Sequence, residues 1–156
     1  MDASTPLTAR EASFLKALLD EHVPFLVVGL AAAALQGVPA VTQDVDLWFA
    51  DLTDAGLRRA LSRVGASYVP PSLSTPPLLV GGGTELFDIV VHMHGLESFE
   101  KEAARALAIN IGGLELPVLP LERIIESKRA TARPKDLAIL PALEEAAKVS
   151  SRRQRP

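Results

Sequence analysis

The chain has 156 residues, and 48% of them are hydrophobic, so it can fold as one compact domain with a buried core. It contains no cysteine, which excludes a disulfide framework, a thiolate metal site and a cysteine nucleophile. A net charge of -3 and an aromatic content of 4% argue against broad capture of nucleic acid and against base-stacking platforms.

The start of the chain and its apolar segments predict a protein without a membrane partner. Residues Met1 to Pro6 lack the basic and apolar regions of a signal peptide, and no apolar run is long enough to span a bilayer. We therefore expect a cytoplasmic location. The first regular element is a helix from a capping box at Thr8 and Glu11 to about residue 20, in which each side chain binds the other's backbone N–H.

A strand, a turn and a short helix are expected next. Phe25 to Val28 is an unbroken apolar run of the kind that forms a buried strand. Gly29 lets the backbone turn sharply, and Leu30 to Leu35 is rich in alanine and predicts a short helix. Gly37 is a natural end for that helix.

Two aspartates on the following predicted strand are the first candidates for chemistry. In a strand over Asp44 to Phe49, Asp44 and Asp46 project from one face while Val45 and Leu47 turn toward the core. Two carboxylates on one face repel each other unless a cation neutralises them, and Mg2+ is bound by a few carboxylates together with substrate phosphates. The alternative is that Asp44 begins the strand and Asp46 is a solvated surface residue.

The remaining pattern predicts short strands, helices and loops. We expect a helix near Leu57 to Val64, two edge strands within a loop over 66–84, a hairpin turn at Gly81 to Gly83, a strand over Glu85 to Met93, a short helix after Ser98, a hairpin from Ala106 to Leu119, and helices over Leu121 to Thr131 and Pro134 to Ala147. Residues 1–149 then form a single small α/β (α+β) domain, with a mixed twisted sheet, flanking helices and two C-terminal helices. Residues 150–156 are expected to be a basic, disordered tail.

Asp88 is a third candidate carboxylate, in the middle of an apolar strand. A buried carboxylate costs free energy unless it is paired or binds a metal. Beside Asp44 and Asp46 it would complete a site in which two acids hold metal ions on a triphosphate and the third orients or deprotonates a hydroxyl. The alternative is an ion pair with a lysine or arginine. His92 and His94 share its strand face, where they are metal ligands or, more simply, hydrogen-bonding groups at a strand end.

Lys128 and Asp136 are candidates near the C-terminus. Lys128 follows Ile124 by four residues and Ile125 by three, so it lies on their inward face, where its ammonium group can bind phosphate oxygens. Pro134 fits the first position of the last helix, which places Asp136 at the third, near the positive end of the helix dipole. Capping of that helix is a sufficient explanation of Asp136.

Four motifs in this order resemble the nucleotidyltransferase fold superfamily, in its small branch of minimal nucleotidyltransferases and abortive-infection-type toxins. They are Gly29 after the first strand, Thr42-Gln43-Asp44-Val45-Asp46 on the second, Phe87-Asp88-Ile89-Val90 on a later strand, and Lys128 with Arg133-Pro134-Lys135-Asp136. The resemblance implies Mg2+ or Mn2+ at Asp44, Asp46 and Asp88, catalytic roles for these acids with Lys128 and Asp136, and a nucleotide site formed by Gly29, Leu30, Thr42, Lys128 and Lys135.

The reaction that the resemblance implies moves a nucleoside monophosphate from an NTP to a hydroxyl acceptor, which is a tRNA end, a protein or a small molecule. It also suggests a toxin–antitoxin component with an antitoxin partner. Two departures from the family pattern support an alternative, a catalytically weakened nucleotide-binding or protein-interaction module. Leu30 follows Gly29 where the family usually has glycine or serine, and Pro39-Ala40-Val41 stands where it often has an arginine. A third hypothesis is an α/β domain whose acids are only surface groups.

Overall fold

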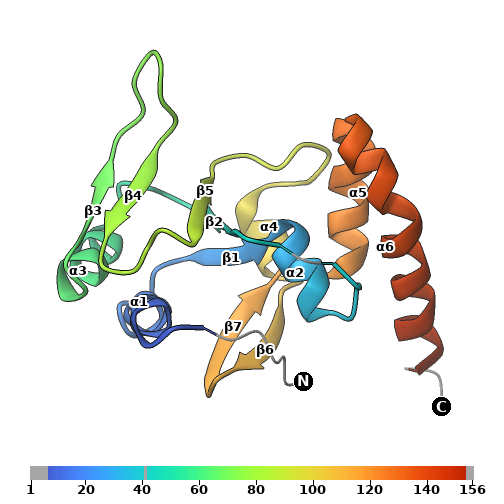
Figure 1. The fold of residues 1–156 in the computed structure, drawn as a ribbon, viewed down its shortest axis with the longest axis horizontal. Helices are drawn as coiled ribbons and strands as arrows, with labels where there is room; N and C mark the ends of the chain where they lie inside the picture. The colour runs from blue at the N-terminus through green and yellow to red at the C-terminus, as the bar shows by residue number, and fades with distance from the viewer. Residues whose placement is uncertain (1–6, 41, 154–156) are drawn as a thin grey trace.

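The computed structural model describes residues 7–40 and 42–153. The elements in chain order are α1 (Ala9–Asp20), β1 (Phe25–Val28), α2 (Gly29–Leu35), β2 (Val45–Phe49), α3 (Ala55–Arg63), β3 (Ala66–Val69), β4 (Leu78–Gly81), β5 (Phe87–Val90), α4 (Phe99–Ala103), β6 (Leu107–Ile111), β7 (Leu114–Val118), α5 (Leu121–Thr131) and α6 (Pro134–Arg153). Helices α5 and α6 stand together at one end of the molecule, and the β3–β4 hairpin extends from the other (Figure 1).

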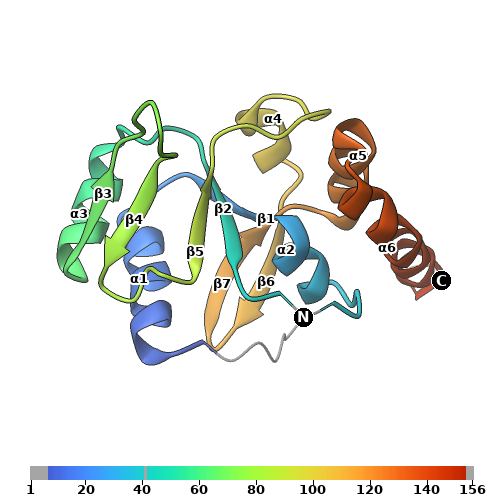
Figure 2. The ribbon, with the colours of Figure 1, turned by 45° about the horizontal axis from the view of Figure 1, so that its top comes forward.

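The main sheet has five strands in the order β5-β2-β1-β7-β6 (Figure 2). Strand β1 is antiparallel to β2 and parallel to β7, β2 is parallel to β5, and β6 and β7 form an antiparallel hairpin. The sheet is therefore mixed, and helices flank it. This arrangement confirms the predicted α/β (α+β) class with two C-terminal helices.

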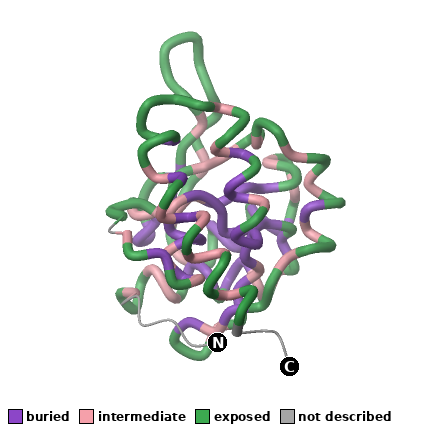
Figure 3. The backbone as a smooth tube through the Cα atoms, turned by 90° about the vertical axis from the view of Figure 1, so that its right-hand side faces the viewer, coloured by how far each residue is buried: buried purple, intermediate pink, exposed green. Residues whose placement is uncertain are grey.

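The core surrounds the central strand, which is why β1 is buried along its whole length. Helix α1 packs on α3 and β7, α2 packs on β1 and β2, and α5 packs on α6 and α2. Buried side chains include Phe14 of α1, Leu47 of β2, Leu116 of β7 and Ile124 of α5. Buried segments gather in the middle of the molecule, while the loop between β3 and β4 is exposed (Figure 3).

Both predicted helix starts are confirmed by hydrogen bonds. The Glu11 N–H donates to the Thr8 hydroxyl at 3.1 Å, and the Thr8 N–H donates to the Glu11 carboxylate at 2.9 Å. At the start of α6, Pro134 is the first residue, and the Arg133 N–H donates to Asp136 Oδ2 at 3.1 Å. No helix in the described ranges has both the length and the apolar character that crossing a membrane requires.

Strand β5 is shorter than the predicted strand over Glu85 to Met93, because it ends at Val90. It pairs with β2 alone, and the last pair joins Trp48 to Val90 just before β2 itself ends. Since nothing remains to pair with, His92 and His94 lie in the loop after β5 and not on a strand face. The prediction of their shared strand is therefore wrong.

Two other boundaries differ from expectation. The turn at Gly81 to Gly83 connects strands of different sheets, because β4 pairs with β3 while β5 pairs with β2, so the predicted hairpin turn is wrong. Helix α6 continues to Arg153, so the predicted disordered tail is helical over 150–153, and 154–156 lie outside the described residues. The extension is reasonable because no glycine or proline follows Pro141 before residue 154.

Candidate functional site

Strand pairing places two acids side by side in the sheet. Asp46 of β2 is directly opposite Asp88 of β5, and directly opposed residues on neighbouring strands share a face. On its other side, Asp46 is opposite Val28, the last residue of β1. Asp46 therefore lies between Asp88 and the turn that begins at Gly29, as the motif order predicted.

Gly29 is required at this turn for two separate reasons. Its φ of +68° is in the left-handed region, where a side chain is strained. A Cβ atom at this position would lie 2.5 Å from Asp46 Oδ2, well inside contact distance. The absence of a side chain at Gly29 thus leaves the space that the Asp46 carboxylate occupies.

The two neighbouring acids carry charge that the protein does not neutralise. Burial, followed by the negative charge of Asp88, raises the pKa of Asp46, and Lys128 only partly opposes this effect. Burial and the charge of Asp44 raise the pKa of Asp88. Within the described residues, neither carboxylate accepts a side-chain hydrogen bond or forms an ion pair. Asp46 is half-buried, whereas Asp44 and Asp88 are exposed, so the burial predicted for Asp88 is not found. A cation bound here would relieve the repulsion between these acids.

The donor set fits Mg2+ in chemistry, since carboxylate oxygens are hard ligands. Asp44 lies one residue before β2 and is near enough for its charge to raise the pKa of both Asp46 and Asp88. Across 7–40 and 42–153, however, no group of three acidic, histidine or cysteine side chains is arranged so that it could hold a metal ion by itself. Mg2+ commonly keeps several waters and uses substrate phosphates as ligands, so an open set of carboxylates is compatible with it.

Asp136 is the opposite case, a carboxylate that is fully enclosed by donors. It has no exposed surface, and it accepts hydrogen bonds from Lys128 Nζ at 3.2 Å and from the Thr131 hydroxyl at 2.7 Å. Arg133 adds its backbone N–H at 3.1 Å, Nε at 2.7 Å and Nη2 at 3.2 Å. The Arg133 guanidinium above all holds the pKa of Asp136 well below its usual range. Asp136 therefore fixes two cations rather than reaching toward a ligand.

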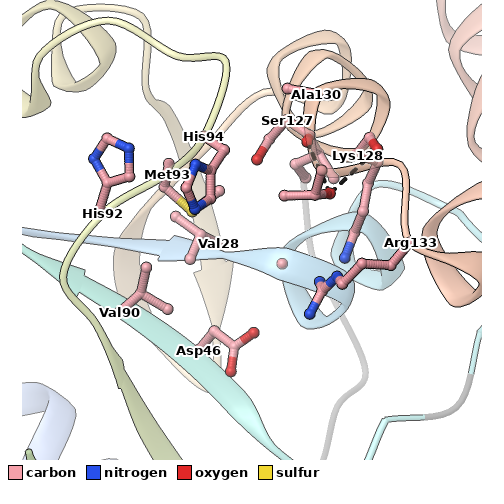
Figure 4. Close-up of a pocket in the computed structure, with 13 residues that line it drawn as sticks. Val28, Asp46, Val90, His92, Met93, His94, Ser127, Lys128, Ala130 and Arg133 are labelled. Carbon is pink, nitrogen blue, oxygen red and sulfur yellow. Dashed lines mark hydrogen bonds between the residues drawn. The ribbon is translucent and has the colours of Figure 1, made fainter. Parts of the chain in front are cut away.

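A pocket of about 590 Å³ lies between the end of β1, the loop after β5 and helix α5. Asp46 is on its floor, and Lys128 and Arg133 extend from the α5 side toward Asp46 (Figure 4). The thirteen lining residues are Val28, Gly29, Asp46, Val90, His92, Met93, His94, Ile124, Ser127, Lys128, Ala130, Thr131 and Arg133. The pocket thus joins the predicted glycine, one predicted acid and the predicted lysine.

A second cavity continues from the same residues toward helix α6. It is about 550 Å³ in volume and shares Asp46, Lys128 and Arg133 with the first. Leu30 and Lys135, two residues of the predicted nucleotide site, line this second cavity. The two cavities together form an elongated site with the Asp46–Lys128 pair at its middle.

Thr42 is the predicted nucleotide-binding residue that lies apart from this site. Its hydroxyl donates to the Asp44 carbonyl at 2.7 Å, and it lines a different, largely apolar cavity with Leu35 and Phe87. In the structure Thr42 contacts the backbone of Asp44 and not the pocket. The negative charges of Asp44 and Asp88 act on Asp46, and Asp88 is also its partner on the neighbouring strand. Neither Asp44 nor Asp88 lines the two cavities that share Asp46.

Several further residues line the pocket, among them Arg133 and Met93, which were not predicted as site residues, and His92, which was predicted only as an alternative metal ligand. Arg133 was visible in the motif before Pro134, but its guanidinium becomes a pocket group only because the turn at Ala132, with φ of +48°, brings it back beside Lys128. His92 and Met93 enter the wall because β5 ends early. The hydrophobic periodicity of the sequence predicted neither the turn at Ala132 nor the early end of β5.

Comparisons with known proteins support the fold. No protein-family model matches the chain. Human gamma-tubulin complex component 6 is 43% identical over 60 residues, which are 38% of this chain, and the chain spans only 3% of the length of that protein. The crystal structure of ANT(2'')-Ia in complex with adenylyl-2''-tobramycin matches with a TM-score of 0.56 and 18% identity over 88% of this chain and 86% of that one. The chain has a nucleotidyltransferase-like fold.

A solution structure of the same neighbour agrees. This structure of the antibiotic-resistance factor ANT(2'')-Ia matches with a TM-score of 0.56 and 17% identity, and the match covers 90% of this chain and 82% of that chain. The similarity therefore extends over most of both chains. It supports the predicted fold class, a small α/β (α+β) domain with a nucleotidyltransferase-like architecture.

Proposed function

We propose that this chain is a Mg2+-dependent nucleotidyltransferase that moves a nucleoside monophosphate from an NTP to the hydroxyl of a small molecule. One observation carries the proposal: Asp46 and Asp88 are directly opposed and unpaired beside a pocket into which Lys128 and Arg133 extend. A structural ion-pair network would have joined these acids to the cations. Here the cations are paired with Asp136 instead, so the two acids on the sheet and the cations that face them both remain available to a ligand.

The acids and cations have complementary roles in this reaction. Asp44 and Asp46 would hold Mg2+, which would neutralise charge on the phosphates when bound, and Asp88 beside them would act on the acceptor hydroxyl. Lys128, Arg133 and Lys135 bind phosphate oxygens in the elongated site. The Gly29 turn exposes backbone N–H groups at the start of α2, although Leu30 offers no hydroxyl to the phosphates. Substrate phosphates thus lie between carboxylates on the sheet and cations on the C-terminal helices.

Asp88 is the proposed base. The acceptor oxygen attacks the α-phosphorus, a new O–P bond forms, the bond from the α-phosphorus to the bridging oxygen breaks, and pyrophosphate leaves with that electron pair. The hydroxyl proton passes to the Asp88 carboxylate. A raised pKa makes Asp88 a better proton acceptor than an ordinary aspartate, which is the direction that this role needs.

Asp136 is a positioning residue in this proposal, and it replaces the catalytic contact expected from the resemblance. It orients Lys128 and Arg133 by four hydrogen bonds and accepts a fifth from Thr131, and it is fully buried although it is among the residues around the second cavity. Thr42 similarly fixes the Asp44 backbone. Membership of the minimal or abortive-infection branch, a toxin–antitoxin role with an antitoxin partner, and a cytoplasmic location stay predictions.

One observation favours the alternative of a nucleotide-binding module without turnover. Over the described residues no closed metal site is preformed, and Leu30 removes a phosphate contact that the family pattern usually provides. In this alternative the same pocket binds nucleotide and Mg2+, and chemistry does not follow. Both functions therefore predict binding of nucleotide and Mg2+, and only the transferase predicts release of pyrophosphate.

The test combines binding with turnover. Each of ATP, CTP, GTP and UTP is assayed with millimolar Mg2+. We expect at least one of them to raise the melting temperature of the wild type but not of Asp46→Asn or Asp88→Asn. With a preferred acceptor present, the wild type should then release pyrophosphate from the NTP. The rate in Asp46→Asn should be about 10³-fold lower, which corresponds to about 4 kcal/mol of lost transition-state stabilisation. Stabilisation without pyrophosphate release supports the binding module. No stabilisation by any NTP rejects both functions.

A further inference from the structure

The walls of the main pocket differ in charge from one side to the other. On one side, Lys128 of α5 and Arg133 of the turn after α5 are charged and suit phosphate, and Lys135 adds charge in the neighbouring second cavity. On the side of the loop after β5, the wall consists of Val90, His92, Met93 and His94 and faces Ile124 and Ala130 of α5. Apart from Asp46 on the floor, no lining residue of this pocket is an acid.

The two histidines make this wall a semi-aromatic surface. Their rings are 4.8 Å apart and perpendicular to each other, an edge-to-face arrangement. Around them stand the apolar side chains of Met93 and Val90, and Ser127 provides a hydroxyl (Figure 4). A ligand here meets apolar area and hydrogen-bonding rings, and no carboxylate apart from the shared Asp46.

The wall is also held in place before any ligand arrives. A Cβ atom on Gly95 would lie 2.5 Å from the Ala130 Cβ, so the loop is in direct contact with α5. The Glu97 N–H donates to Glu102 Oε2 at 2.9 Å, and Arg123 of α5 binds Glu102 through Nε at 2.9 Å and Nη2 at 2.8 Å. These contacts hold the backbone of the loop against α5, while the His92 and His94 side chains are exposed. A loop held in this way needs less ordering when a ligand binds.

These observations bear on the acceptor, on the assumption that the proposed function holds. A cationic acceptor would approach Lys128 and Arg133 with the same sign of charge, and the only carboxylate available to it is the one proposed to hold metal. An acceptor with an apolar or aromatic face instead buries area against Met93, Val90 and the imidazole rings. We infer that the acceptor is a neutral hydroxyl compound with an aromatic face, not a polyamine such as an amino sugar.

Two further acids, behind the loop after β5, do not change this expectation. Glu97 and Glu100 line a separate cavity behind His92, with Trp48 and Phe99. Glu97 is already paired with Arg105 at 2.6 Å. These acids therefore lie outside the wall that faces Asp46.

The test uses three matched benzyl alcohols that differ only in charge: 4-methylbenzyl alcohol, 4-(aminomethyl)benzyl alcohol and 4-(hydroxymethyl)benzoate. Each is titrated by protein-observed NMR, with and without Mg2+ and a non-hydrolysable ATP analogue. We expect the neutral probe to bind at least about tenfold more tightly than the cation, equivalent to about 1.4 kcal/mol. A cation or anion that binds as tightly as the neutral probe, or no binding by any of the three, overturns the inference.

Two variants of the same loop locate the effect. His94→Asp places a carboxylate in the pocket wall, and we expect it to raise the affinity for the cationic probe severalfold and to remove the preference for the neutral one. Val91→Asp is the matched control, because Val91 is 62% exposed and does not line the main pocket. Equal changes in both variants would show that long-range charge, and not the wall, controls selection, and would also overturn the inference.

Binding of the ATP analogue separates this inference from the proposed function. If the analogue fails to bind while the neutral probe is still preferred, the proposed function fails and the selectivity of the wall remains. If the analogue binds with Mg2+ and the cationic probe is preferred, the proposed function survives and the acceptor class is wrong.

Discussion

Asp136 and Asp46 lie on either side of Lys128, and the structure treats these two aspartates in opposite ways. Asp136 is fully buried and accepts five hydrogen bonds, three of them from Arg133. Asp46 is only half-buried, and its neighbours in the sheet include another acid, Asp88. The pKa of Asp136 is lowered chiefly by Arg133, whereas burial raises the pKa of Asp46. The fold has thus neutralised the acid that orients the cations and has left the acid in the pocket uncompensated.

Removal of the charge of Asp136 should have the largest effect on stability. Asp136→Asn leaves Lys128 and Arg133 without their buried counter-charge, and breaking a buried pair in this way costs about 4 kcal/mol of unfolding free energy. Urea denaturation measures the change. Glu144→Gln is the control, because Glu144 forms an exposed pair with Arg129 and should cost less than about 1 kcal/mol. Similar losses in both variants would contradict the distinction drawn here.

Glu102 is a second neutralised acid, and its contribution should depend on pH. The Arg123 hydrogen bonds, above all other causes, lower the pKa of Glu102 below its ordinary value of 4.5. Its ion pair therefore stabilises the fold fully above that value and loses its contribution as pH falls through the lower, folded-state pKa. We expect Glu102→Gln to cost about 3 kcal/mol at pH 7 and progressively less below about pH 4.5. A difference that stays constant over this range would be contrary to expectation.

The space beside Asp46 should be sensitive to a single methyl group. Gly29→Ala adds a Cβ where only 2.5 Å separates it from Asp46 Oδ2, at a φ of +68°. We expect it to cost about 2 kcal/mol of stability and to weaken nucleotide binding in the presence of Mg2+. Gly37→Ala is the matched control, since Gly37 also has a positive φ, of +97°, but has no atom near its Cβ position. Calorimetry should show normal nucleotide binding in this control.

Neutralisation of Asp46 should have the smallest effect on stability without metal. A raised pKa means that the ionised carboxylate is less favourable in the folded state at neutral pH, so Asp46→Asn should change the unfolding free energy by no more than about 0.5 kcal/mol or increase it. The same variant should lose the stabilisation by Mg2+ that the wild type shows. A clear loss of stability without metal would mean that Asp46 is a structural acid, like Asp136.

The sequence predicted the site where its signals were local. The period of two in β2 and the charged residue within the apolar run of β5 identified Asp46 and Asp88. The Pro134 helix start likewise predicted the position of Asp136. Their register depended on which strands pair, and the parallel pairing of β2 with β5 was not encoded in either segment alone.

The parts that were missed depend on distant contacts. His92 enters the pocket wall because β2 gives β5 no further partner, and Arg133 enters because one left-handed residue at Ala132 turns the chain back toward Lys128. Thr42 was expected to bind nucleotide and instead bonds to its own neighbour. In each case the residue type suggested a role, but the direction of the side chain was set by contacts with another part of the fold.

Strand β5 lies at the edge of the sheet and is hydrogen-bonded only to β2. Local opening of an edge strand requires much less free energy than unfolding of the buried centre. When β5 opens, Asp88 separates from Asp46 while β1 and its core remain folded. The proposed activity therefore depends on one of the least protected hydrogen-bond ladders of the sheet, and it should be lost on warming before the protein unfolds as a whole.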